Sequence, residues 1–232
     1  MNTIHAGHAP AGKRYCGAVG ILNESTVNRD ILREFMRIHD AEYEPCFCDI
    51  TCDNLTYSLD GLCKRANEKA GREDVNISLH INASNSKDAN GCEVLCFSNT
   101  NTEFSSYLSK KLSEKLGVKN RDSKIRPELK FLNSTKGHSF IVEAFFCTNA
   151  NDCNTYNNGG NEKIARAILE TMEHFGLARR KSAPIAPSTP VEETSNAGYT
   201  VQVGAFSTKE NAENYKNKLN DVYGINGFVK EK

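Results

Sequence analysis

The segment "VNISLHINA", residues 75–83, decides the fold, because it is the clearest strand signal in the chain. Its apolar residues occupy alternate positions, at Val75, Ile77, Leu79 and Ile81. Successive side chains of a strand point to opposite faces, so these four residues would line one buried face. The segment therefore predicts a β-strand that packs against a core and carries His80 near its end.

Helix-like and strand-like segments alternate on both sides of this strand. Residues 24–40 place apolar side chains at spacings of three and four, which is typical of a helix with one buried face. Residues 138–146, "HSFIVEAFF", form a continuous apolar run suited to a buried strand. The other predicted strands are 2–6 and 92–97, and the other predicted helices are 57–71, 104–116 and 161–175. This alternation predicts an α/β fold with a largely parallel sheet.

A change of composition divides the chain. Residues 178–198, "ARRKSAPIAPSTPVEETSNAG", hold three of the six prolines among Ser, Thr and Glu, without apolar periodicity. Such a composition is typical of a semi-extended linker. We therefore predict a large domain over residues 1–177, a linker over 178–198 and a short tail over 199–232.

Charge and hydropathy narrow the possible partners. The 29 basic and 29 acidic residues give a net charge of +0, whereas a nucleic-acid-binding protein normally needs a basic face. No apolar run approaches the roughly 20 residues that span a bilayer. The first residues lack a basic segment followed by an apolar run, so no signal peptide is expected.

The nine cysteines are an odd number, and a chain of this size does not need disulfides for stability. We expect most of them to be reduced, small buried residues. An alternative is a soft-metal site in "CFCDITC", residues 46–52, where the thiolates stand at ligand-like spacings.

Four polar residues are candidates for chemistry, because open α/β sheets place their sites at the carboxyl ends of the strands. His8 follows the first strand, Glu24 begins the first helix, His80 lies near the end of its strand, and Glu143 interrupts an apolar run. Singly, a strand histidine can be structural and a first-turn glutamate can favour the helix dipole. A carboxylate in a buried strand costs several kcal/mol unless it is paired or metal-bound, so Glu143 requires a reason.

Together these residues suggest a metal site. Two histidines and one glutamate form a known catalytic zinc set that leaves one position open for water. A fourth carboxylate nearby would then act as general base on that water.

The same residues lie in stretches that resemble a known family. The stretches "GHAPAGKRYCGAVGILNES", "RANEKAGREDVNISLHINA" and "IVEAFFCTN", in that order, resemble the zinc-dependent N-acetylmuramoyl-L-alanine amidases of the Amidase_3 type, which include cell-wall amidases and phage endolysins. The resemblance covers about residues 3–176. It implies a twisted, mostly parallel sheet flanked by helices, with one Zn²⁺ at the sheet edge and peptidoglycan as substrate.

The resemblance also assigns roles to residues. His8, Glu24 and His80 match the zinc ligands, and Glu143 matches the catalytic glutamate. The implied reaction is hydrolysis of the amide between N-acetylmuramic acid and L-alanine of the stem peptide by a zinc-activated water.

Three details of this assignment are expectations. Gly7 would let the chain turn so that His8 faces the metal. His5 stands where the family often has an acidic residue, and it would compete as a ligand or orient one by a hydrogen bond. Asn82 is a candidate for substrate binding, with a simple turn as the alternative.

The tail resembles the first half of a SPOR domain, a module that binds glycan strands stripped of stem peptides. The stretch "VQVGAFS", residues 201–207, carries this resemblance. The tail has about half the length of a full module and buries little apolar surface alone. The alternatives are therefore a segment that pairs or packs elsewhere, and a vestigial tail.

Two other functions remain open from the sequence. A zinc peptidase that cuts within the stem peptide would use the same metal set, and a wall-binding protein with an inactive site would bind without hydrolysis. For an enzyme made in the cytoplasm that acts on the wall, the absence of a signal sequence favours endolysin-type release or action in a mother cell.

Overall fold

The computed structural model describes residues 1–52, 58–181, 209, 212–213 and 216–217. The chain divides into two compact units, Met1–Lys181 and Ser182–Lys232. Glu44 N donates to Arg179 O and Lys181 N donates to Glu42 O, both at 2.8 Å. The first unit therefore continues four residues beyond the predicted boundary at 177, whereas the rest of the predicted linker and most of the tail lie outside the described residues.

The first unit is a mixed α/β domain. In chain order its elements are β1 (Asn2–Ala6), α1 (Glu24–Glu42), β2 (Phe47–Asp49), α2 (Leu59–Lys69), β3 (Val75–Asn82), β4 (Cys92–Cys96), η1 (Asn99–Asn101), α3 (Thr102–Leu116), β5 (Asn120–Ile125), α4 (Lys130–Ser134), β6 (His138–Phe146), α5 (Ala150–Asn157) and α6 (Gly160–His174). The strand order is β2-β1-β3-β6-β4-β5, and β4 pairs antiparallel with β6 whereas the other neighbours are parallel. The prediction of a mostly parallel sheet flanked by helices is confirmed.

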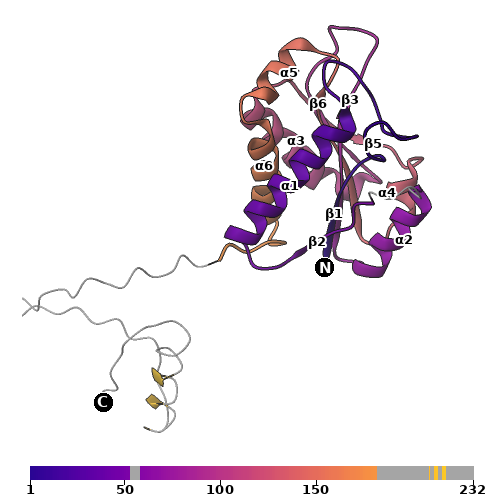
Figure 1. The fold of residues 1–232 in the computed structure, drawn as a ribbon. Helices are drawn as coiled ribbons and strands as arrows, with labels where there is room; N and C mark the ends of the chain where they lie inside the picture. Colours follow the sequence, from indigo (N-terminus) through magenta and orange to yellow (C-terminus); the bar gives the residue numbers. More distant parts are fainter. Residues whose placement is uncertain (53–57, 182–208, 210–211, 214–215, 218–232) are drawn as a thin grey trace, which may run out of the picture. The chain divides into compact units, whose positions relative to one another are not determined.

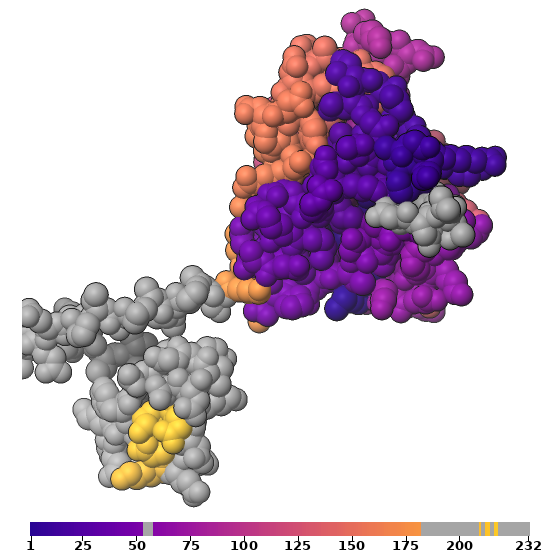
Figure 2. All heavy atoms as spheres, viewed as in Figure 1, coloured from indigo at the N-terminus to yellow at the C-terminus, as the bar shows by residue number. Residues whose placement is uncertain are grey.

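Helices cover both faces of the sheet (Figure 1). The larger core joins one sheet face to α1, α3 and α6, and includes Ile77, Phe140 and Ile168. Figure 2 shows the violet atoms of α1 adjoining the orange atoms of the C-terminal helices on this side of the domain. The smaller core lies under α2 and α4 and includes Leu62, Phe131 and Ile141. The second face is therefore only partly covered by apolar packing, which leaves room for polar side chains.

The helix ends follow local rules. Asn23 caps α1 by accepting a hydrogen bond from Thr26 N at 3.1 Å, and Ser58 caps α2 by accepting one from Gly61 N at 3.0 Å. α3 ends at Gly117, whose φ of 74° is a conformation that glycine adopts without strain. Within the described residues, none of the helices has the length and hydropathy that a membrane crossing requires.

Five elements were not predicted: β2, η1, β5, α4 and α5. β5 has the sequence "NRDSKI" and is mostly exposed at the sheet edge, so it carries no apolar alternation to detect. Charged residues on an edge strand are a common protection against pairing with another chain. β2 and α4 are three and five residues long, too short for a periodic pattern.

Candidate active site

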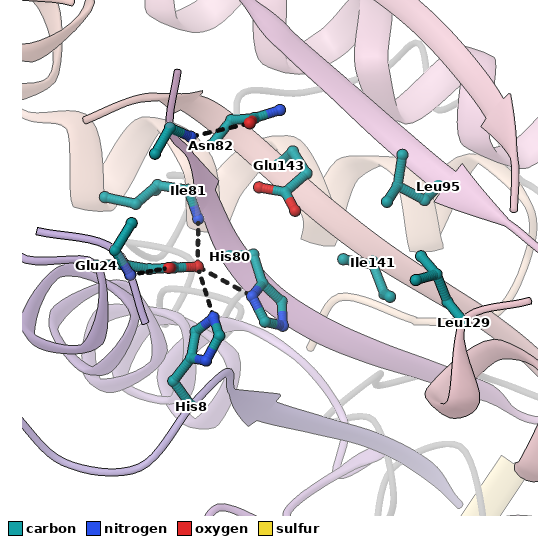
Figure 3. Close-up of a pocket in the computed structure, with 11 residues that line it drawn as sticks. His8, Glu24, His80, Ile81, Asn82, Leu95, Leu129, Ile141 and Glu143 are labelled. Atoms are coloured by element: carbon teal, nitrogen blue, oxygen red, sulfur yellow. Dashed lines mark hydrogen bonds and ion pairs between the residues drawn. The ribbon is translucent and has the colours of Figure 1, made fainter. Parts of the chain in front are cut away.

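Three of the predicted residues lie together: His8 and His80 both point to one carboxylate oxygen of Glu24. His8 Nε2 lies 3.1 Å and His80 Nδ1 lies 3.0 Å from Glu24 Oε1 (Figure 3). His8 follows β1, Glu24 is the first residue of α1, and His80 lies near the end of β3. One ligand atom from each residue lies within 4.8 Å of the others, and this is the one such group found in the part of the chain that the structure describes.

The backbone around His8 is held in an uncommon conformation. His8 has a φ of 69°, in the left-handed region that residues other than glycine rarely adopt. Arg29 Nη2 donates to His8 O at 3.1 Å, and Ser25 Oγ donates to the next carbonyl, Ala9 O, at 2.6 Å. α1 therefore supplies both the carboxylate of Glu24 and the contacts that hold His8 towards it.

The chain bends at residues 7–9, as the expectation for Gly7 requires. The left-handed residue is His8 itself, and Gly7 is not among the residues with positive φ. A Cβ at Gly7 would lie 2.4 Å from the His80 ring and 2.5 Å from Leu79 O. Gly7 is therefore also needed for the close approach of His80.

Glu143 lies beside this group on the neighbouring strand. It is in register with His80 across the β3–β6 pair, and its side chain faces the same space (Figure 3). Its Oε2 is buried and finds no hydrogen-bond partner among the described residues. Burial, with a smaller contribution from the charges of Glu24 and Glu93, raises the pKa of Glu143 well above its ordinary value.

Two of the other titratable groups of the site, Glu24 and His80, have pKa values shifted by different surroundings. Burial alone would raise the pKa of Glu24, but the hydrogen bonds from His8 and His80 outweigh it, so this pKa lies well below its ordinary value. Burial lowers the pKa of His80, and the nearby Glu24 carboxylate offsets only part of that effect. The site thus combines an ionised carboxylate with an imidazole that tends to stay neutral, which are the forms that bind metal.

Two cavities meet at the histidines. The first, of about 320 Å³, is lined by His8, Glu24, His80, Asn82 and Glu143 together with apolar residues. The second, of about 510 Å³, shares His8 and His80 and continues along Tyr15, Ser58 and Lys130. Asn82 Nδ2 donates to Glu93 Oε1 at 3.1 Å, so Asn82 is held at the rim, and its role in substrate binding stays a prediction.

His5 is not brought to the carboxylate. Its ring is 1% exposed, packs edge-on against Phe131 at 4.9 Å, and places Nδ1 3.1 Å from Ala6 O. Burial lowers the pKa of His5 to about 3. His8, rather than His5, therefore joins the group of possible ligands.

The cysteines do not form a second centre within the described residues. None of the nine forms a disulfide among the described residues, and none belongs to a group of metal-ligand geometry there. Cys46 Sγ lies 3.6 Å from His39 Nε2, and Cys48 Sγ donates to the carbonyl of Asp49. The alternative of a soft-metal site in residues 46–52 thus has no support in the geometry.

The sequence reasoning missed two residues that shape the site. Gly17 has a φ of 77°, and a Cβ there would lie 2.5 Å from Glu24 Oε2 and 2.6 Å from His8 Cδ2. Ser78 Oγ lies 2.9 Å from His80 Nε2. The i, i+2 spacing of Ser78 and His80 on one strand was the available signal for the second residue.

Comparison with solved structures supports this fold. The catalytic domain of the CD27L endolysin targeting Clostridia difficile is 28% identical, with a TM-score of 0.65, over 74% of this chain and 96% of that chain. The catalytic domain of CwlV, an N-acetylmuramoyl-L-alanine amidase from Bacillus (Paenibacillus) polymyxa var. colistinus, is 21% identical, with a TM-score of 0.63, over 76% and 99%. The amidase AmiC2 of Nostoc punctiforme is 19% identical, with a TM-score of 0.62, over 75% and 96%.

Matches to family profiles assign the chain to a family. No match is found among curated protein sequences. The SPOR domain profile matches residues 195–232, in agreement with the resemblance of the tail. The profile of N-acetylmuramoyl-L-alanine amidase, Amidase_3, matches residues 3–174, which include His8, Glu24, His80 and Glu143. With this match over most of its length, and with the fold of the amidase catalytic domains, the chain belongs to the Amidase_3 family of N-acetylmuramoyl-L-alanine amidases, which act on peptidoglycan.

Proposed function

We propose that this peptidoglycan amidase works with one zinc ion held by His8, Glu24 and His80, and with Glu143 as its general base. The observation that carries the proposal is the convergence of two imidazole nitrogens on one carboxylate oxygen, beside a buried carboxylate without a partner among the described residues. An amide hydrolase needs both an electrophile for the carbonyl and a base for the attacking water.

The donor set fits zinc. Two histidine nitrogens and one carboxylate oxygen are ligands that Zn²⁺ accepts in catalytic sites. Ligands at 2.0–2.1 Å from a tetrahedral ion lie roughly 3.3 Å apart. The separations of 3.0 and 3.1 Å from Glu24 Oε1 are close to that value, so small side-chain movements would accommodate the ion.

The residues divide the chemistry between them. Bound at these residues, zinc supplies a Lewis acid that polarises the substrate carbonyl and activates a water. Glu143 accepts a proton from the attacking water and then delivers it to the departing amine. The carbon–nitrogen bond breaks, leaving a carboxylate on the lactyl group and a free amino group on L-alanine. Burial raises the pKa of Glu143, which favours holding the proton between the two steps, and a cation bound beside it would favour the ionised form that first accepts that proton.

The bond and the metal dependence are tested together by end-group analysis. Purified peptidoglycan is digested with the protein as prepared, after treatment with a chelator, and after zinc is returned. We expect new N-terminal L-alanine that disappears on chelation and returns with zinc. New amino termini on other stem residues would indicate a peptidase, and release of L-alanine termini that resists chelation would disprove the zinc proposal.

We further propose the predicted order of a catalytic domain, a linker that ends at residue 198 and a glycan-binding tail over 199–232, with the boundary between domain and linker moved from residue 177 to residue 181. The SPOR match over residues 195–232 supports the tail, and the described part of that segment is too small to show its fold. In a pull-down with glycan strands stripped of stem peptides, the full chain should bind and a chain ending at Lys181 should not. Equal binding by the two would exclude a targeting role.

The similarity to an endolysin catalytic domain supports lysin-type release as the route to the wall, ahead of a mother-cell enzyme. Expression together with a membrane-permeabilising protein should then lyse a culture abruptly, whereas expression alone should not. Lysis by the chain alone would contradict this route.

A further inference from the structure

A row of polar side chains runs along one face of the β1–β3 pair towards His80. The register aligns Thr3 with Asn76 and His5 with Ser78, and the Gly7 N–H donates to Leu79 O beside His80. Aligned residues on neighbouring strands project from the same face. The first pair is hydrogen-bonded, since Thr3 Oγ1 lies 2.7 Å from Asn76 Oδ1.

Each nitrogen of the His80 ring has a hydrogen-bond partner. Nδ1 faces Glu24 Oε1 at 3.0 Å, and Nε2 lies 2.9 Å from Ser78 Oγ. If Nδ1 binds the metal through its lone pair, the ring proton must be on Nε2, which then donates to Ser78 Oγ. The hydroxyl of Ser78 accepts this bond and keeps its own proton free to donate.

His5 supplies an acceptor nitrogen, Nε2, to complement the free proton of the Ser78 hydroxyl. Its Nδ1 lies 3.1 Å from the carbonyl oxygen of Ala6, which can only accept, so Nδ1 carries the proton and Nε2 is an acceptor. His5 Nε2 is buried and has no hydrogen-bond partner among the described residues. Ser78 and His5 line the same 510 Å³ cavity, and a water placed between them would have the Ser78 hydroxyl and His5 Nε2 as partners.

We propose that Ser78 and His5 are positioning residues for the metal site, joined in a hydrogen-bond chain from His80 Nε2–H to Ser78 Oγ and, through one water, to His5 Nε2. The proposal rests on the proposed zinc site. This hydrogen-bond chain fixes the tautomer of His80 and the direction of its Nδ1. It also gives His5 Nε2 a hydrogen-bond partner. Partners of metal-binding histidines commonly act in this way.

The surroundings of His5 favour the acceptor form. Its ring packs against Phe131 and is 1% exposed, so it is shielded from water outside the cavity. Burial, aided by the positive charge of Arg65 and by the neighbouring His80, keeps His5 neutral near pH 7. A neutral ring with its proton on Nδ1 is the form that the chain requires.

The test measures zinc affinity of the full chain by competition with a chromophoric chelator. Ser78→Ala removes the acceptor for His80 and should weaken zinc binding roughly 10–100-fold, the range found for such partners. Ser78→Thr keeps the hydroxyl and should restore affinity close to that of the wild type. His5→Phe keeps a ring against Phe131 without the acceptor and should weaken binding several-fold, and His5→Gln, which has an acceptor oxygen, should recover part of the loss.

Thr3→Val is the matched control. It removes a buried hydroxyl from the same strand pair, where Thr3 contacts Asn76 rather than the ligands. It should lower the free energy of unfolding without changing zinc affinity. If Thr3→Val weakens zinc binding as much as His5→Phe, or if Ser78→Ala binds zinc like the wild type, the positioning role is disproved.

A second measurement reports the tautomers directly. Nitrogen-15 chemical shifts of the zinc-loaded protein should show the proton of His80 on Nε2 and that of His5 on Nδ1. A proton on His5 Nε2 would disprove the proposed hydrogen-bond chain. Failure of the wild type to bind zinc would instead overturn the proposed metal site, so the two failures are distinguishable.

Discussion

The two faces of β3 have different roles: one packs in the core, and the other carries polar side chains. One face carries Val75, Ile77, Leu79 and Ile81, each at most 1% exposed and part of the larger core. The other carries Asn76, Ser78, His80 and Asn82, and each of these has a hydrogen-bond partner at a defined atom. Glu143 and His5 project from the same side on the neighbouring strands. We call this side the polar face.

The two faces differ in how strictly each position requires a particular residue. Burial of apolar side chains is favourable without a preferred direction, so one aliphatic residue can replace another at modest cost. A buried polar group needs a partner in a fixed position, so each residue of the polar face depends on a particular neighbour. We therefore expect changes on the polar face to alter function and changes on the apolar face to alter stability.

The largest effect should come from Glu143→Gln. Replacing the proposed general base should lower kcat by about 10³-fold, within the range for acid–base groups, because no other side chain would accept the proton from water. Zinc content should stay the same, since Glu143 is not among the three converging residues. Kinetics on purified walls and metal analysis check both outcomes. Loss of zinc together with activity would make Glu143 a ligand and contradict its assignment.

Ile77→Ala should mainly reduce stability. Ile77 is fully buried between β3 and the helices, and truncating such a residue costs about 3 kcal/mol through lost burial and a cavity. Zinc affinity and kcat of the folded protein should remain close to those of the wild type. Denaturant unfolding and a zinc titration measure the two effects. A large fall in zinc affinity would show that the faces are not independent.

Acid should destabilise the metal-free protein through His5. The pKa of His5 is about 3 when folded and near 6.5 when unfolded, so between these values the unfolded chain binds one more proton. The contribution to stability is full above about pH 6.5 and is lost as the pH falls towards 3. From pH 7 to pH 5 the loss should be about 2 kcal/mol. Unfolding at the two pH values should show less pH dependence for His5→Phe, and equal dependence would refute the shift.

The smallest effect should come from Asn82→Ala. If Asn82 binds substrate through one hydrogen bond, KM should rise about fivefold, equivalent to roughly 1 kcal/mol, with kcat nearly unchanged. Glu93→Gln is the control, because Asn82 donates to Glu93 and a purely structural role would act through that contact. An equal rise of KM in both variants would favour the structural role.

Much of the fold was predictable because its signals are local. Alternation in β3, the stripe of α1, the Asn23 cap and the Gly117 stop each depend on neighbours within a few residues. β5 was missed because an exposed edge strand has no apolar pattern. The short β2 and α4 are held by contacts with distant elements rather than by their own sequence.

The candidate site was predictable in composition and not in detail. A carboxylate in the apolar run around Glu143 signals function by its cost alone. Positions near strand ends suggested the grouping of His8, Glu24 and His80, the resemblance assigned their roles, and the structure brings both histidines to one oxygen of Glu24. The turn at Gly7 was predictable, but the close approach of His80 was not, because a clash with a ring 73 residues away leaves no trace in the local sequence.

The sequence by itself determined most of the longer strands and helices, which face of β3 is apolar, and which residue types are available for chemistry. These properties depend on periodicity, capping and the cost of burying charge, which act over one or two turns of chain. Only the tertiary structure decided that His8 rather than His5 faces Glu24, and that Ser78 and His5 stand behind His80. Such choices depend on strand register and on distances of a few ångströms between residues far apart in the chain, which only the folded sheet defines.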